Sequence, residues 1–236
     1  MLQNNSGYFS SIPPVTKNII IINLIIWLAD ALLSSKGIYL SKNLGLYYVL
    51  SDSFKPHQIF TYMFMHGGFS HVFFNMFAVF MFGRTLETVW GAKKFLIYYI
   101  LTGVGAALTQ EIVYTITYSD LIFNAPEIIN TTKGILSRQE VLNLLPATVG
   151  ASGAVFGVLV AFGMLFPNVE LIMFPIFIPI KAKWFVIGYG VLELFLGISN
   201  NPADNVAHFA HLGGFITGLI ILLIWKRNAR RNGRYF

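Results

Sequence analysis

The chain reads TVGASGAVFGVLVAFGMLF over residues 148–166, and this stretch holds no charged side chain. Its length is close to the roughly 20 mostly apolar residues that a membrane-spanning helix needs. A second apolar stretch, residues 206–225, carries His211 near its start, and Ser152 stands near the start of the first. Strongly polar and ionisable side chains inside a bilayer are costly and usually mark a functional site. The pair therefore suggests a hydrolase that works within the membrane.

The composition places the whole chain in the membrane. Of its 236 residues, 56% are apolar and only 11% are charged, whereas a soluble domain carries about 25% charged residues. The mean hydropathy is +0.66. The chain has no cysteine, which excludes disulfides, thiolate metal sites and a cysteine nucleophile.

The apolar stretches predict an all-α, polytopic membrane protein with six spans in one domain. Residues 171–180 are also apolar, but two prolines interrupt them and they are too short to span. We therefore expect interfacial or packed coil there. A short surface helix is expected near residues 137–145. The predicted spans are residues 18–33, 70–85, 95–117, 148–166, 184–198 and 206–225.

Basic residues orient this bundle. With the N-terminus inside, the cytoplasmic segments hold eleven of the 16 Lys and Arg residues, which is the positive-inside bias. Segments 1–17 and 226–236 are then cytoplasmic, and the membrane domain 18–225 has long outside loops at 34–69 and 119–146. The basic tail directly follows an apolar helix, which favours an anchor on the lipid bilayer over nucleic-acid binding. We expect a bacterial cytoplasmic membrane, with the site toward the outer face.

The topology brings polar side chains from three helices to one depth. The second, fourth and sixth spans all start on the outer side, so Ser152 and His211 lie about one turn into the membrane. His71 and Asn75 lie in the first two turns of the second span, four residues apart and therefore on one helix face. His66 just precedes that span. We expect these groups to form one cluster.

Glycine pairs on two of these helices predict close packing. Gly153 and Gly157 are four residues apart on the fourth span, and Gly214 and Gly218 are four apart on the sixth. Such small-xxx-small ridges let helix backbones approach closely. Close approach is what a serine hydroxyl and an imidazole need to share a hydrogen bond of roughly 2.6–3.2 Å.

Several motifs, taken in order, resemble those of the rhomboid intramembrane serine proteases. The resemblance covers about residues 46–218. A single Gly-x-Ser-Gly is a weak signal, but the whole set in order with a compatible topology is a strong one. The matching positions are His66, His71 and Asn75 for His-x4-His-x3-Asn, 150–153 for Gly-x-Ser-Gly, 210–218 for Ala-His-x-x-Gly-x-x-x-Gly, and 87–91 for Glu-x-x-x-Gly.

The resemblance implies a Ser–His dyad with Ser152 as nucleophile and His211 as general base. It also implies an oxyanion site made of the Ser152 backbone N–H and the side chains of His71 and Asn75. It implies no cofactor and no metal. The substrates would be membrane proteins whose transmembrane segments enter between the second and fifth spans. The supporting positions are His66, Gly150, Gly153, Phe156, Gly214 and Gly218.

Two positions depart from the family's usual pattern. Phe156 stands where the family often has a tyrosine stacked on the catalytic histidine, so the aromatic face is kept and the hydroxyl is lost. His57 stands where an outer-loop tryptophan is frequent, so the resemblance does not say how that loop is anchored.

No carboxylate is obviously placed to orient the imidazole of His211. Asp204 lies seven residues earlier, about two turns away in an outside loop. We therefore expect a dyad without a carboxylate, in which packing against Phe156 holds the ring. His208 is a rival base three residues before His211, but it lies nearer the water.

Three other functions remain open. A transporter would use Asp30, Glu111 and Glu193 as an ion path, whereas we expect these carboxylates to make helix-terminal or interhelical hydrogen bonds. A metal-dependent protease would use the histidines at positions 66, 71, 208 and 211, although the chain has no His-Glu-x-x-His helix. A catalytically silent relative would bind membrane proteins for routing or quality control, but the intact Ser–His pair argues against it.

Overall fold

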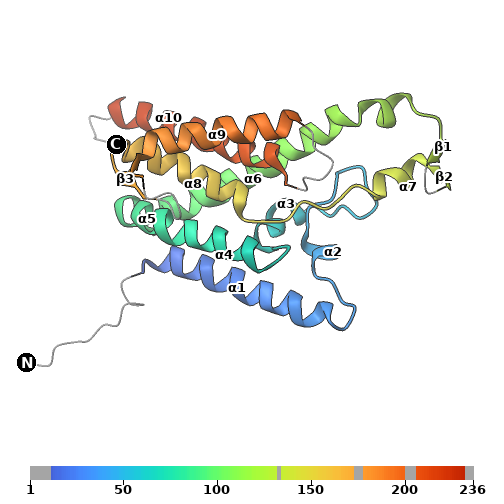
Figure 1. The fold of residues 1–236 in the computed structure, drawn as a ribbon, viewed down its shortest axis with the longest axis horizontal. Coiled ribbons are helices and arrows are strands. Elements are labelled where there is room, and N and C mark those ends of the chain that lie inside the picture. Colours follow the sequence, from blue (N-terminus) through green and yellow to red (C-terminus); the bar gives the residue numbers. More distant parts are fainter. Residues whose placement is uncertain (1–11, 132–133, 173–177, 200–205, 232–236) are drawn as a thin grey trace, which may run out of the picture.

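The computed structural model describes residues 12–131, 134–172, 178–199 and 206–231, whose course Figure 1 shows. Within these ranges, five helical segments are long and apolar enough to cross a membrane, and a sixth apolar helix has only 14 residues. The predicted all-α membrane bundle is confirmed, although only five of its six spans reach that length. The six segments are α1 (Pro14–Ser34), α4 to α5 (Phe69–Trp90), α6 (Ala92–Thr117), α8 (Ser152–Leu165), α9 (Ala182–Ser199) and α10 (His208–Arg231).

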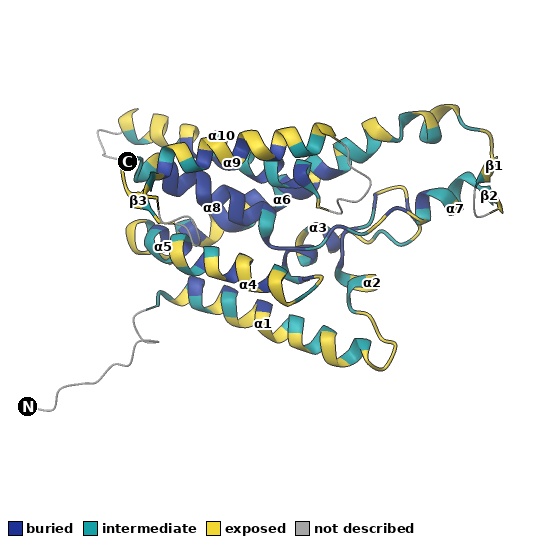
Figure 2. Cartoon of the chain, in the orientation of Figure 1, coloured by how far each residue is buried: buried dark blue, intermediate teal, exposed yellow. Residues whose placement is uncertain are grey.

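The short helix α8 lies at the centre of the bundle. Every residue from Gly153 to Gly163 is buried, and α8 packs against α6, α9 and α10. Figure 2 shows α8 as an almost continuous dark blue stretch, while α1 and α9 carry exposed residues along their outer sides. A helix that is apolar all round belongs in an interior, so the composition of α8 already suits its central position.

The second span is one helical segment with a π-helical turn at its middle. In chain order it consists of α4 (Phe69–Ala78), η3 (Val79–Gly83) and α5 (Arg84–Trp90). It stops at Gly91, whose φ of 79° lies in the left-handed region that glycine adopts without strain. The predicted end at residue 85 was too early, because Arg84 and Glu87 interrupt the apolar pattern without ending the helix.

Glu87 of this segment holds the beginning of α1. Its carboxylate accepts hydrogen bonds from the backbone N–H of Val15 at 2.9 Å and of Thr16 at 2.7 Å, and from the Thr16 hydroxyl at 2.7 Å. The first N–H groups of a helix lack intrahelical partners and favour a negative charge. The Glu-x-x-x-Gly motif at 87–91 therefore joins two helices and ends one of them.

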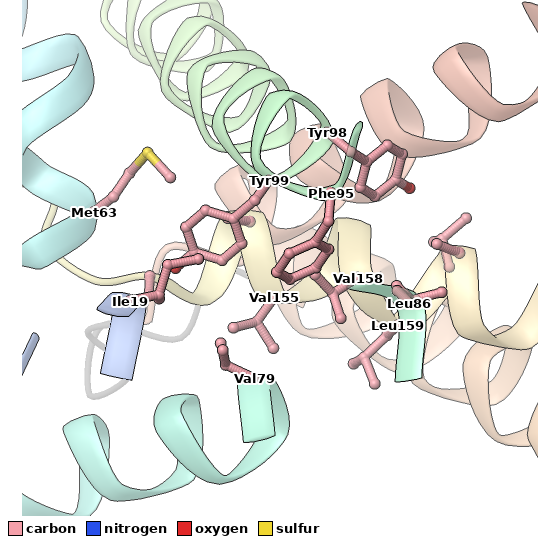
Figure 3. Close-up of a cluster of buried hydrophobic side chains, with 14 of the residues drawn as sticks. Ile19, Met63, Val79, Leu86, Phe95, Tyr98, Tyr99, Val155, Val158 and Leu159 are labelled. Carbon is pink, nitrogen blue, oxygen red and sulfur yellow. The ribbon is translucent and has the colours of Figure 1, made fainter. Parts of the chain in front are cut away.

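Aromatic side chains of α6 form much of the core. Figure 3 shows Phe95 and Tyr99 among the labelled apolar side chains of α8, including Val155 and Val158. The hydroxyl of Tyr98 donates a hydrogen bond of 2.8 Å to the carbonyl oxygen of Gly157. Backbone and side-chain polar groups inside a bilayer need such protein partners, so α6 fixes the position of α8 by packing and by hydrogen bonding.

Glycine lets α10 approach α8 at backbone distance. A Cβ added to Gly214 would overlap the carbonyl oxygen of Gly153, and one added to Gly218 would lie 3.1 Å from the Cα of Gly157. The interface therefore has no room for side chains at these positions, as the small-xxx-small pattern predicts. The contact brings the first turns of the two helices side by side.

The loop between α1 and α4 and the loop between α6 and α8 are bonded to each other. Leu46 forms an isolated bridge with Thr148, and the Ser51 hydroxyl donates to Asn143 Oδ1 at 2.9 Å. These contacts set the chain directly before α8. The elements of the loops are α2 (Ser41–Leu44), α3 (Gln58–Thr61), η2 (Tyr62–Phe64), η4 (Asp120–Asn124), β1 (Ile128–Thr131), β2 (Gly134–Ser137) and α7 (Arg138–Asn143).

The loop between α6 and α8 contains both a confirmed element and an unexpected one. The predicted surface helix is α7, which begins with a capping box between Ser137 and Glu140. Strands β1 and β2 pair as an antiparallel hairpin. The hairpin was not predicted, because strands of four residues are too short to show a clear alternation of apolar and polar side chains.

The described ends of the segment between α8 and α9 pair with each other. Strand β3 (Glu170–Leu171) pairs antiparallel with β4 (Ile180–Lys181), so the predicted coil at 171–180 has its two described ends paired. Its residues 173–177 lie outside the described residues, as do parts of both predicted cytoplasmic segments, 1–11 and 232–236.

Candidate active site

The Ser152 hydroxyl lies in hydrogen-bond contact with the His211 imidazole. The distance from Ser152 Oγ to His211 Nε2 is 2.7 Å. Ser152 is the first residue of α8 and His211 lies in the first turn of α10, so the glycine contact between these helices sets the distance. The structure thus brings together the two residues that the sequence pairs.

Gly150 makes room for a second imidazole at this position. Its φ of 129° lies in a region that side-chain-bearing residues rarely adopt. A Cβ added there would lie 2.7 Å from Nε2 of His71. The missing side chain therefore lets His71 of α4 lie against the backbone that leads into Ser152.

Phe156 stacks on the His211 ring. The two rings are nearly parallel, at an interplanar angle of 11°, with centroids 4.6 Å apart. Phe156 is four residues after Ser152 on α8, so one helix supplies both the hydroxyl and the aromatic surface. The stacking of an aromatic ring on His211, expected from the sequence, is therefore present. Phe156 lacks the hydroxyl of the tyrosine that is frequent at this position, and it stacks without it.

The contacts of His71 indicate which of its ring nitrogens carries the proton. The backbone N–H of Gly67 donates to Nδ1 of His71 at 3.4 Å. In a neutral imidazole one nitrogen accepts and the other donates, so Nε2 carries the hydrogen. That N–H is the one near Gly150, on the side of the ring toward Ser152.

Asn75 is buried one turn further along α4. One hydrogen of its amide group is donated to the carbonyl oxygen of His71 at 2.9 Å. An amide group carries two donor hydrogens, so this bond holds the side chain in place and still leaves a second donor on the same nitrogen. Its position on the same face of α4 as His71 agrees with their spacing of four residues.

His66 packs edge to face on His71, with ring centroids 4.9 Å apart. Both of its ring nitrogens are buried, with the backbone carbonyl of Phe64 as a polar neighbour. Burial, with the neighbouring His71, lowers the pKa of His66 to about 3, while the Phe64 carbonyl opposes that shift. The ring is therefore neutral at physiological pH.

The structure corrects one expectation, because a carboxylate does contact His211. Oε2 of Glu193, on α9, lies 2.9 Å from Nδ1 of His211 and 2.6 Å from Nδ1 of His208. The predicted dyad without a carboxylate was wrong. Glu193 lies six residues before the end of α9 and His211 three residues after the start of α10, so both lie toward the same end of the bundle, but the sequence does not show which faces of α9 and α10 meet.

None of the other candidates for acid and base is bonded to Ser152 in the described part of the chain. His208 contacts Glu193, and it is His211 that contacts the serine. Asp204 lies outside the described residues. Glu111 accepts from the backbone N–H of Val49 at 2.8 Å and Asp30 from that of Leu40 at 2.8 Å. These bonds join each helix to a loop, which agrees with the hydrogen-bonding role expected for these carboxylates.

His57 anchors the loop between α1 and α4 in place of the aromatic residue that the family often has there. Its Nε2 lies 2.9 Å from the carbonyl oxygen of Asn43, and Gln58 Nε2 donates to the same oxygen at 3.3 Å. The loop is therefore held by hydrogen bonds to backbone.

Glu193, His208 and His211 are also the one group of residue types suited to a metal ion within the described ranges. His66 and His71 do not belong to it, so the four-histidine site considered from the sequence does not form. The distances of 2.6 and 2.9 Å from the carboxylate oxygen to the two nitrogens are those of direct hydrogen bonds.

The fold is a bundle of helices long and apolar enough to cross a membrane, with a serine–histidine contact at one end. The Rhomboid domain family matches residues 53–228. The chain therefore belongs to the rhomboid family.

Relatives from several kinds of organism share this domain. Rhomboid-like protein 11, chloroplastic, of Arabidopsis thaliana is 28% identical over 88% of this chain and 63% of its own. The rhomboid protease AarA of Providencia stuartii is 29% identical over 69% of this chain and 53% of its own. The chain thus spans about half to two thirds of the length of these two relatives. YdcA of Bacillus subtilis is 25% identical over 96% of both chains.

Proposed function

We propose that the protein is an intramembrane serine endopeptidase that cleaves transmembrane or membrane-adjacent segments of other membrane proteins. The observation that carries the proposal is the 2.7 Å contact between Ser152 Oγ and His211 Nε2. A serine hydroxyl is a weak nucleophile until a base takes its proton, and this distance allows direct transfer. Membership of a family that includes a named protease supports the same chemistry.

The reaction follows from these positions. As Ser152 Oγ attacks the substrate carbonyl carbon, its proton moves to Nε2 of His211, and the same nitrogen then returns a proton to the leaving amine. The acyl-enzyme is hydrolysed by a water molecule that His211 deprotonates. Both residues are only partly buried, which is consistent with access of water.

Three donors are available for the negative oxygen of the tetrahedral intermediate. They are the Ser152 N–H at the beginning of α8, the Nε2–H of His71 and the Asn75 amide. Preorganised donors of this kind are each worth about 10²–10³ in rate. Gly150 supports the arrangement because it lets His71 approach the serine.

We propose that substrates enter from the lipid between α4 and α9. On α4 the phenylalanines at positions 69, 73, 74 and 77 are exposed, and α9 exposes several large apolar residues. Exposed apolar faces of this kind suit contact with lipid or with a transmembrane segment. We propose a bacterial cytoplasmic membrane as the location of the protein. We also propose that both termini lie inside, and the distribution of basic residues supports this orientation.

The test compares cleavage of a single-span substrate by the detergent-solubilised parent, Ser152→Ala and His211→Ala. We expect the parent to cleave and both variants to lose activity. Binding of the substrate without cleavage by the parent would instead indicate a catalytically silent relative. Cleavage that survives Ser152→Ala would contradict the proposed nucleophile.

A further inference from the structure

Glu193 is a buried carboxylate on α9, and the reaction proposed above gives it no role. Its side chain is 5% exposed, and it is the single acidic residue of α9. An ionised group in such a place is costly unless it is paired. Its two partners, His208 and His211, both come from the neighbouring helix α10. The carboxylate therefore faces the candidate catalytic histidine and not the lipid.

The hydrogen bonds to Glu193 determine the tautomer of His211. An ionised carboxylate only accepts hydrogen bonds, so both contacting Nδ1 atoms must carry hydrogen. In neutral His211 the lone pair is then on Nε2, the atom 2.7 Å from Ser152 Oγ. That is the form in which the imidazole can take the serine proton. The opposite tautomer would present an N–H to the hydroxyl and could not act as base.

His208 restrains the carboxylate itself. Its Nδ1 contacts the same oxygen as His211, at 2.6 Å against 2.9 Å, and its side chain is only 8% exposed. Two donors from one helix turn fix the position of Oε2 with respect to α10. Phe156 stacks on the face of the His211 ring and so restrains the plane of that ring. Together these contacts leave the imidazole one orientation.

We propose that Glu193 is a positioning residue that turns the dyad into a Ser152–His211–Glu193 triad, with His208 holding the carboxylate. The inference rests on the proposed function. When Ser152 loses its proton to His211, the ring becomes an imidazolium whose Nδ1–H remains bonded to the carboxylate. The negative charge then faces a positive one, and no further proton has to move.

The decisive variant is Glu193→Gln, which keeps size and shape but removes the charge and the acceptor-only character. We expect kcat to fall about 10²-fold or more while KM changes less than about threefold, because an ill-placed tautomer affects the chemical step and not binding. The matched control is Glu111→Gln, the same change at another partly buried carboxylate, and it should keep kcat within about twofold. Parental kcat in Glu193→Gln would overturn the proposal.

A second readout separates this inference from the proposed function. A fluorophosphonate forms a bond from its phosphorus to Ser152 Oγ as fluoride leaves and His211 takes the proton, whatever the natural substrate is. We expect fast labelling of the parent, none of Ser152→Ala, and slow labelling of Glu193→Gln. A parent that is labelled but cleaves no substrate would contradict the proposed function alone. A parent that is not labelled would overturn both, and equal labelling of parent and Glu193→Gln would overturn the triad.

A purely structural role of Glu193 predicts a different pattern. In the triad, adding Glu193→Gln to His211→Ala causes no further loss of labelling, because the carboxylate acts through that histidine. A further loss in the double variant would overturn the proposal. If Glu193→Gln does not fold, Glu193→Asp carries the test. It keeps the charge but withdraws it by one methylene, so we expect a loss of about tenfold in kcat at unchanged KM, and parental kcat would contradict the triad.

The same three residues allow a direct test of the metal alternative. We expect EDTA and added Zn²⁺ to leave the labelling rate of the parent unchanged at low micromolar concentrations. Loss of labelling with EDTA that Zn²⁺ restores would show that the cluster holds a metal ion, and the positioning role would be abandoned.

Discussion

Two histidine pairs flank the Ser152 hydroxyl, and they differ in what surrounds them. His66 and His71 lie on the α4 side and pack edge to face. In the described part of the chain, no carboxylate is bonded to either of them. His208 and His211 lie on α10, and both contact Glu193. The first pair is suited to donate a hydrogen bond while neutral, and the second is suited to accept a proton.

The comparison teaches that residue type and spacing do not assign a role to a histidine. Both pairs lie at the end of the bundle that holds Ser152, and within each pair the two imidazole rings lie edge to face. The two pairs differ in the carboxylate of Glu193, which comes from a third helix. Because this carboxylate only accepts hydrogen bonds, it keeps the hydrogen of His211 on Nδ1 and leaves Nε2 free to accept a proton. The predictions below test this division from the largest expected effect to the smallest.

Removing the imidazole of His71 should lower the rate of cleavage and leave substrate binding intact. We expect His71→Ala to reduce kcat about 10²–10³-fold, the usual effect of losing one oxyanion donor, with little change in KM. Steady-state cleavage of a single-span substrate measures it. His57→Ala, in the loop between α1 and α4, is the control and should be close to the parent. A loss confined to KM would assign His71 to substrate binding instead.

Separating α10 from α8 should weaken the contact between His211 and Ser152 without changing either His208 or His211. A Cβ at Gly214 would overlap the Gly153 carbonyl oxygen, so Gly214→Ala must shift α10. Such overpacking typically costs about 1–3 kcal/mol, and a displacement near 1 Å can cost about 10²-fold in rate. We expect a loss of about 10–10²-fold and a lower Tm. Gly188→Ala on α9, where a Cβ has open space, is the matched control.

The aromatic surface beside His211 should have a smaller effect. Stacked rings contribute about 0.5–1.5 kcal/mol beyond their burial, so Phe156→Leu should lower kcat about 2- to 10-fold. Phe156→Tyr keeps the stacked ring and should stay closest to the parent. The ratio of the two rates measures the stacking. Equal rates would mean that Glu193 alone suffices to hold the imidazole.

The buried, neutral His66 should make the stability of the fold sensitive to acid. The pKa of His66 is lowered to about 3, so between pH 6.5 and 3 the unfolded chain binds a proton that the folded protein does not. Stability therefore falls as the pH drops through this range, by at most about 1.4 kcal/mol per pH unit. We expect a smaller drop in Tm from pH 7 to pH 5 in His66→Asn than in the parent. An unchanged drop, with His57→Asn as control, would contradict this.

Much of the architecture follows from the sequence alone. The apolar runs predict the membrane helices because a spanning segment must satisfy its backbone internally and be apolar outside. The glycine pairs predict the α8–α10 contact, and the order of the spans places Ser152, His211 and His71 at one depth. The hairpin β1–β2 and the continuation of the second span to Trp90 were missed, since short strands and single charged residues give no clear periodic signal.

The sequence by itself determined that this is a helical membrane bundle and which side chains can approach one another, because periodicity and length act locally along the chain. Only the tertiary structure decided which way each helix turns about its axis. That rotation puts Glu193 of α9 against the two histidines of α10, and not against lipid or another partner. Its cause lies in packing across helices distant in sequence, and for this reason the carboxylate beside His211 could not be predicted from the motifs.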